Sequence, residues 1–302
     1  MKTKSLIRPF IAFIILSAVV ISCSKNDKND QAQAQQEEYA LASTESDAEA
    51  EIISNDVFDN VLGVNAEVGI GGTGVFAGSK PNEDGSIYGP MGVDSVGRCF
   101  TVAAESLDSG STFPIKVTID FGEGCTGRDG RIRKGKIITE YSDRLIFPGA
   151  TAMTSFDGYS VNGIAIEGSH LITNTSNSNG LAFKINIDGK LSRDNGDFVD
   201  LASEKNISQS AGTSTPFDIR DDAYSITGSA NGTTKRGDKT FAWQTEIISP
   251  LVKKFGCRWI VQGKISHQKD GVKIAEFDYG SGTCDNQATL DVNGQTRIIT
   301  LY

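Results

Sequence analysis

The chain has 302 residues, and its 38 acidic and 29 basic side chains give a formal net charge of −9 at pH 7. A chain this acidic lacks the positive field that draws proteins to nucleic acids or to anionic lipid, so we exclude both as partners bound through overall charge. Its 33 glycines and only 7 prolines favour short strands joined by tight turns.

Residues 1–22 have the parts of a lipoprotein signal peptide. Basic side chains within the first eight residues precede an apolar run over 10–21. This run is shorter than the roughly 20 residues that a helix needs to cross a bilayer, so it predicts a secretory signal. It ends in VISC at 20–23, the pattern of a lipobox, in which Cys23 becomes the lipidated first residue of the mature protein. The alternative is an ordinary signal peptide in which this cysteine has no role.

Residues 23–44 predict a flexible tether, because they are rich in Gln, Asp, Glu, Asn and Ala and contain almost no aliphatic side chain. Over 45–63, apolar side chains recur loosely at helical spacing. Ser46 and Glu49 have the spacing of a capping box, and Gly63 would end a helix. We therefore predict one short helix over 45–63, with one face packed on the following domain.

Residues 64–302 predict a single β-domain. In 115–121, apolar side chains occupy every second position, as in a half-buried strand. Asn-Gly and Asp-Gly pairs between such runs predict hairpin turns. These pairs include 162–163, 188–189, 231–232, 270–271 and 293–294. The expected fold is mainly β: an antiparallel sandwich, or an open barrel or meander, with one short N-terminal helix.

The β-domain contains an internal repeat over about 95–142 and 253–302, which indicates a duplicated hairpin unit. The phrase DFGEGC at 120–125 returns as DYGSGTC at 278–284. The two phrases open with Asp120 and Asp278, and the distance in sequence between these aspartates equals the distance between Cys99 and Cys257.

Four cysteines remain after Cys23, and an even number in an exported protein predicts disulfides. If 270–271 is a two-residue turn and no bulge intervenes, Cys257 and Cys284 face each other across the hairpin at disulfide distance. The matching pattern in the first copy predicts a bridge between Cys99 and Cys125.

The aspartate of each phrase is expected to cap the end of its hairpin through its side chain. The alternative for the first copy is a calcium site formed by Asp120, Glu123 and Asp129. Because Ser281 replaces the glutamate in the second copy, we favour the structural role and predict no metal site.

Other motifs do not identify an activity. GIGGTG at 69–74 matches a dinucleotide-binding pattern, but the glycines and proline that follow exclude the required helix. His170 and His267 are too few for a zinc cluster, and the chain has no G-x-S-x-G motif. Tyr159, Tyr224, Trp243 and Trp259 could form a sugar-stacking platform, but we expect them to cover the core of the sheet. We predict no catalytic residue and no cofactor.

The stretches IDFGEGCTGRDGRIRKGKIIT and DYGSGTCDNQATLDVNGQTRIITL resemble a family of uncharacterised Bacteroidota lipoproteins with Cys-flanked D-[FY]-G-x-G repeats. The resemblance covers about 95–302 and implies placement on the outer membrane, facing the periplasm or the cell surface. It implies no activity. We therefore expect a lipid-anchored envelope protein with a structural or ligand-binding role. The alternatives are a hydrolase of glycans or peptides and an accessory subunit of an outer-membrane complex, so a glycan or an outer-membrane protein would be the partner.

Overall fold

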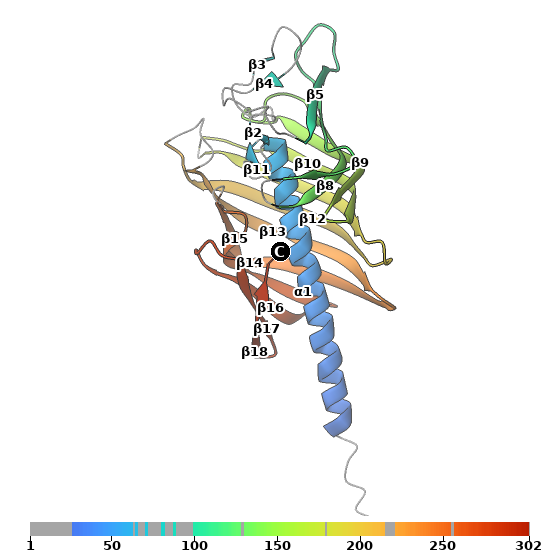
Figure 1. The fold of residues 1–302 in the computed structure, drawn as a ribbon. Helices are drawn as coiled ribbons and strands as arrows, with labels where there is room; N and C mark the ends of the chain where they lie inside the picture. The colour runs from blue at the N-terminus through green and yellow to red at the C-terminus, as the bar shows by residue number, and fades with distance from the viewer. Residues whose placement is uncertain are drawn as a thin grey trace, which may run out of the picture.

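The computed structural model describes residues 26–62, 99–127, 130–178, 180–214, 221–254 and 257–301, together with four two-residue strands between 64 and 88. These four strands form two small pairs, β1 (Val64–Asn65) with β2 (Ile70–Gly71) and β3 (Lys80–Pro81) with β4 (Ile87–Tyr88). The other described elements are one long helix and the strands of one large sheet (Figure 1).

The main sheet has 14 antiparallel strands and is not closed. They are β5 (Thr101–Ser106), β6 (Ile115–Asp120), β7 (Cys125–Thr126), β8 (Ile132–Tyr141), β9 (Thr151–Val161), β10 (Ile164–Asn174), β11 (Ala182–Ser192), β12 (Phe198–Ala211), β13 (Ala223–Arg236), β14 (Lys239–Lys254), β15 (Ile260–Lys269), β16 (Val272–Ser281), β17 (Gln287–Val292) and β18 (Gln295–Thr300). Each strand pairs with the next along the chain, except that β6 pairs with β8 and the short β7 pairs with β8 beside it. The prediction of a mainly β protein built as an open antiparallel meander is therefore confirmed.

The described residues contain one helix, α1 (Asn26–Leu62). It crosses one face of the sheet, which curls around it (Figure 1). The predicted tether over 23–44 is wrong from Asn26 onward, and the predicted short helix is the last part of a helix of 37 residues. Gln, Glu, Lys and Ala are good helix formers. The side chains of Tyr39 and Ala40 are already buried, so the helix is held by the sheet over part of the segment predicted to be free.

Ser46 lies inside this helix and therefore caps nothing. Its hydroxyl donates to the carbonyl of Ala42, one turn earlier, at 2.7 Å. The predicted capping box is thus a pair of mid-helix residues. Although α1 is long, the described residues contain no helix that is both long and apolar enough to cross a membrane.

The core lies between α1 and the inner face of the sheet, the face turned toward the helix. Phe58 of α1 meets Phe183 of β11 edge to face, with ring centroids 5.9 Å apart. Tyr39 meets Phe241 of β14 in the same way at 5.3 Å. The hydroxyl of Tyr141 donates to the last-turn carbonyl of the helix at 2.7 Å.

The aromatic residues considered for a sugar platform are mostly part of this core. Tyr159, Tyr224 and Trp243 are almost fully buried, and Trp259 is partly buried and packs against the core cluster. The indole of Trp243 lies against Gly232 of the neighbouring strand, where an added Cβ would lie 2.5 Å from the ring. The structure thus favours the core interpretation for these side chains.

Several predicted turns are present. The pairs 162–163, 270–271 and 293–294 join consecutive strands, and all six residues have positive φ, as a type I′ turn requires. The turns predicted at 188–189 and 231–232 are wrong, because these residues lie inside β11 and β13. At 232 the glycine makes room for Trp243 rather than for a turn.

The two disulfides join Cys99 to Cys125 and Cys257 to Cys284, with Cα atoms 5.2 and 5.8 Å apart. These are the predicted pairings, but the register argument behind them is wrong. The register set by the turn at 270–271 holds for only two residue pairs and then shifts at two irregularities. Cys257 and Cys284 therefore lie beyond the paired part of the hairpin instead of facing each other within it.

The repeated phrase forms the same turn in both copies. Asp120 accepts a hydrogen bond from the backbone N–H of Gly122 at 2.8 Å, and Asp278 accepts one from Gly280 at 2.8 Å. Both glycines have positive φ. Beyond the phrase the copies differ, because β8 pairs with β6, whereas β18 pairs with β17.

Candidate functional site

The inner face of the sheet carries many polar side chains where a sheet that covers a core is usually apolar. Buried polar residues on strands β8 to β15 include Arg133, Thr139, Thr154, His170, Asn174, Ser203, Lys205, Thr234, Thr245, Lys253 and His267. A face of this composition can bury a helix only if the helix supplies matching polar groups.

Helix α1 supplies carboxylates along its length. Glu37 pairs with Arg297 at 2.6 Å and Glu38 with Lys239, Glu49 pairs with Arg193, and Glu51 pairs with Lys205. Closer to the C-terminal end, Asp56 pairs with Arg133 at 2.7 Å and Asp59 with Lys253 at 3.1 Å. These cations come from β8 to β18, so the charges fix how far along the sheet the helix sits.

The pairs become more buried toward the middle and C-terminal end of α1. Lys239 and Glu38 are 59% and 50% exposed, whereas Lys205 and Glu51 are 10% and 5% exposed. Removing one partner of a buried pair is costly, because the remaining charge has lost both water and its counter-ion. The inner pairs therefore constrain the helix far more than those at the rim.

Two buried histidines and one buried carboxyl accompany these pairs. Burial lowers the pKa of His170 to about 3, and nearby Lys205 adds to the shift. Burial also lowers the pKa of His267 to about 3. Burial raises the pKa of Asp47 to about 7, although Lys205 opposes this shift. Within the described part of the chain, no ring nitrogen of either histidine has a hydrogen-bond partner, so neither forms a Ser–His pair there.

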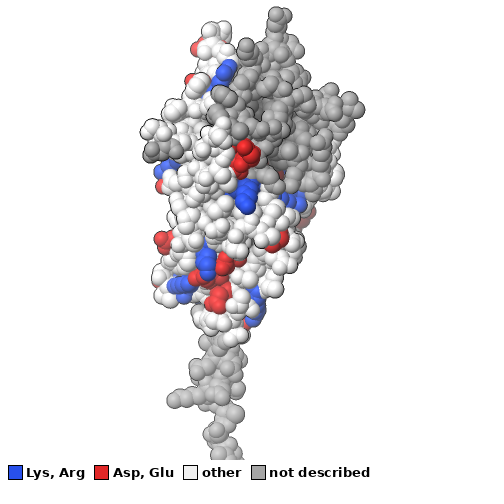
Figure 2. Space-filling view, turned by 90° about the vertical axis from the view of Figure 1, so that its left-hand side faces the viewer, with Lys and Arg blue, Asp and Glu red and all other residues white. Residues whose placement is uncertain are grey.

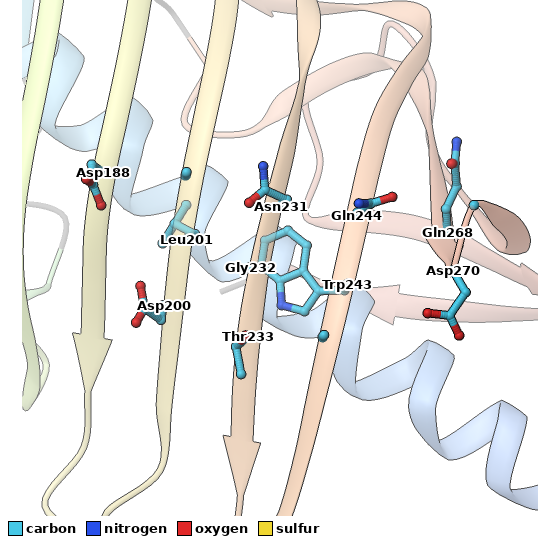
Figure 3. A pocket seen from close by; sticks show the side chains of 13 residues that line it. Asp188, Asp200, Leu201, Asn231, Gly232, Thr233, Trp243, Gln244, Gln268 and Asp270 are labelled. Carbon is cyan, nitrogen blue, oxygen red and sulfur yellow. The ribbon is translucent and has the colours of Figure 1, made fainter.

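A shallow hollow of about 540 Å³ lies on the outer face of the sheet, over β11 to β15. Figure 3 shows three carboxylates around it, from Asp188, Asp200 and Asp270, with the amides of Asn231 and Gln244 between them. Among the described residues, no group of three or more His, Cys, Asp or Glu side chains is arranged to hold a metal ion. The hollow offers hydrogen-bonding groups but no cation.

A deeper candidate, which we call the arginine cavity, lies between α1 and the sheet and has a volume of about 720 Å³. Its apolar wall consists of Ile52, Ile53, Val161, Ile164, Ile298 and Leu301. Its charged wall consists of Arg131, Arg193, Arg236, Arg258, Glu45, Glu49 and Asp197. Part of the cavity wall comes from β18, which is an edge strand of the open sheet. The cavity therefore lies at the opening between this edge and the helix.

Four guanidinium groups thus face three carboxylates in this cavity. Glu49 pairs with Arg193 and lies 3.6 Å from Arg236. Burial and the neighbouring Arg193 guanidinium lower the pKa of Arg236, which indicates that positive charge is crowded here. Arg131 pairs with Asp56 at 3.3 Å.

Arg258 is the exception. Across the described ranges it makes no ion pair, and its buried Nε has no hydrogen-bond partner. Its guanidinium lies 5.5 Å from the ring centroid of Trp259. A guanidinium that is packed on an indole and has an unused Nε–H donor is suited to bind an anion.

The surface outside the cavity has a mixed charge. On the side shown in Figure 2, acidic and basic side chains lie beside one another and form no large patch of one sign. The net negative charge of the chain therefore does not define a binding face on this side.

The predicted site residues do not come together in this cavity. Cys23 and Asp129 lie outside the described residues, and Asp120 is occupied in its turn. The four arginines were not singled out from the sequence. Each belongs to a different part of the sheet, so no short motif joins them.

Comparison of the chain with protein-family models, with curated proteins and with solved structures gives no match in any of the three. The function must therefore be argued from the site itself.

Proposed function

We propose that the protein is a lipid-anchored, non-catalytic binding protein of the cell envelope, placed on the outer membrane. The observation that carries the proposal is the position of α1. Only Ser24 and Lys25 separate Cys23 from the first residue of the helix. The same helix continues without a break to the residues that pack against the sheet. A lipid on Cys23 would thus be connected to the folded domain by a helix rather than by a flexible chain.

The N-terminal turns of this helix extend beyond the sheet (Figure 1). In the described part of the chain, the first ion pairs between helix and sheet occur at Glu37 and Glu38. Residues 26–36 would therefore act as a spacer of about 17 Å, at ~1.5 Å per helical residue. The spacer would hold the sheet and its cavity away from the lipid headgroups.

The arginine cavity supports a binding role. It combines an apolar wall with a few polar groups, which is the usual composition of a small-molecule site. Hydrolysis of glycans or peptides is not favoured by the histidines, since both are buried in the core without a hydrogen-bonded serine among the described residues.

The test is metabolic labelling with an alkyne analogue of palmitate in cells that express the full chain. We expect the wild-type protein to be labelled and to remain in the membrane fraction, and Cys23→Ser to lose both properties. Ser22→Ala is the matched control, because it keeps a small residue beside an intact cysteine. Undiminished labelling of Cys23→Ser would rule out the anchor.

A further inference from the structure

We propose that the arginine cavity binds an anionic amphiphile, a molecule with an acyl chain and a carboxylate or phosphate headgroup. This inference rests on the proposed binding role and adds the chemical class of the ligand. It depends on the geometry of the cavity alone, so it holds or fails independently of the lipid on Cys23.

The headgroup would bind at the charged wall. Among the described residues, Arg258 makes no ion pair and Arg193 has a buried Nη1 without a hydrogen-bond partner, while the Nη2 of Arg193 is bound to Glu49. Guanidinium groups bind carboxylates and phosphates through two parallel N–H bonds, and such charge-assisted bonds are the strong ones. The ligand would thus complete the hydrogen bonding of both arginines.

The acyl chain of the ligand would bind at the apolar wall. Ile298 is 69% exposed on the edge strand β18, the most exposed of the large hydrophobic side chains in the described residues. Ile52 and Ile53 of α1 face the same cavity and are only partly buried. Covering this surface with an acyl chain would remove apolar groups of both the protein and the ligand from water, which favours binding.

The volume is compatible with this class of ligand. A cavity of about 720 Å³ falls within the range of roughly 300–1,000 Å³ that is typical of small-molecule sites. A free inorganic anion would leave the apolar wall uncovered, and an uncharged chain would leave Arg258 unpaired. An amphiphile with a negative headgroup satisfies both walls.

The experiment uses the full chain purified in dodecyl maltoside, an uncharged amphiphile, so that a response reports headgroup charge. Decyl phosphate, decanoate, inorganic phosphate and decyltrimethylammonium are titrated in separate arms, and tryptophan fluorescence is followed. Trp259 is a suitable reporter because it contacts Arg258.

We expect saturable binding of decyl phosphate, decanoate or both, and the arm that binds more tightly identifies the headgroup. Arg258→Gln should weaken binding about ten-fold or more, since a hydrogen bond to a charged group is lost. Arg144→Gln, outside the cavity, is the matched control and should bind as the wild type does.

Ile298→Glu is a second variant, and because Ile298 is exposed, the substitution buries no charge and should leave the fold intact. It places a negative charge in the cavity and should also weaken binding of the anionic ligands. The proposal is overturned if neither anionic amphiphile binds, if the cationic homologue or inorganic phosphate binds equally well, or if both cavity variants bind as tightly as the wild type. Loss of lipidation in the palmitate experiment would not change these results.

Discussion

Lys205→Met tests whether buried charge holds α1 in place. Lys205 lies on β12, and its ammonium group pairs with Glu51 of the helix. Methionine preserves the unbranched apolar stem of lysine and removes its charge. The loss of stability therefore measures the cost of leaving the Glu51 carboxylate buried without its cation.

The expected loss is large. Breaking a buried ion pair by removing one partner typically costs about 3–5 kcal/mol, out of a total stability of roughly 5–15 kcal/mol for a protein. The matched control is Lys239→Met, which removes the cation paired with Glu38 at the rim. Because both members of that pair are at least half exposed, the control should lose about 1 kcal/mol or less.

Urea unfolding measures the two losses. Trp243 is 2% exposed and becomes hydrated when the sheet opens, so its fluorescence reports unfolding, and linear extrapolation gives the free energy in water. Equal losses for the two variants at neutral pH would refute the idea that the inner pairs dominate helix docking.

Three further predictions use the same assay. Replacing Cys257 and Cys284 together by Ser should cost about 3 kcal/mol in the chain-entropy model, and an unchanged midpoint would contradict it. Gly232→Val should destabilise the fold by about 1–3 kcal/mol, because the added Cβ would lie 2.4 Å from the backbone oxygen of Asp200 and 2.5 Å from the indole of Trp243, and a neutral effect would contradict this. Because folding lowers the pKa of His170 and His267, their contribution to stability is fully present above pH 6.5 and is lost as the pH falls toward 3. Because folding raises the pKa of Asp47, its contribution to stability is present in acid and is lost as the pH rises through 7. Asp47→Asn should therefore lose more stability than the wild type between pH 8 and pH 5, and identical pH profiles would contradict this.

The sequence predicted those parts of the fold that depend on nearby residues. The turn at 270–271 needs two residues that tolerate positive φ, and Asp-Gly provides them. The aspartate caps of the repeated phrase are equally local, because each side chain reaches a backbone N–H two residues on. The bridge between Cys257 and Cys284 was predicted from a hairpin register that the structure does not keep, and the bridge between Cys99 and Cys125 was predicted from the repeat; both pairings are present.

The helix could not be predicted in the same way. The usual signal for a packed helix is an apolar stripe, and residues 26–44 contain almost none. The partners of this polar helix lie far along the chain. Glu37, for example, pairs with Arg297, and only the folded sheet shows that a basic wall faces the acidic segment. A criterion based on hydrophobicity therefore assigned the segment to a tether.

The cavity depends on that same non-local pairing. Glu49 of α1 contacts both Arg193, which follows β11, and Arg236, which ends β13. The carboxylate that helps to fix the helix therefore also sets the position of two of the four guanidinium groups in the cavity. Since the helix that begins beside Cys23 carries this carboxylate, the segment that connects the proposed anchor to the sheet also forms one wall of the proposed site. The proposed spacer and one wall of the proposed site are thus parts of one continuous helix, and a displacement of α1 along the sheet would alter the cavity directly.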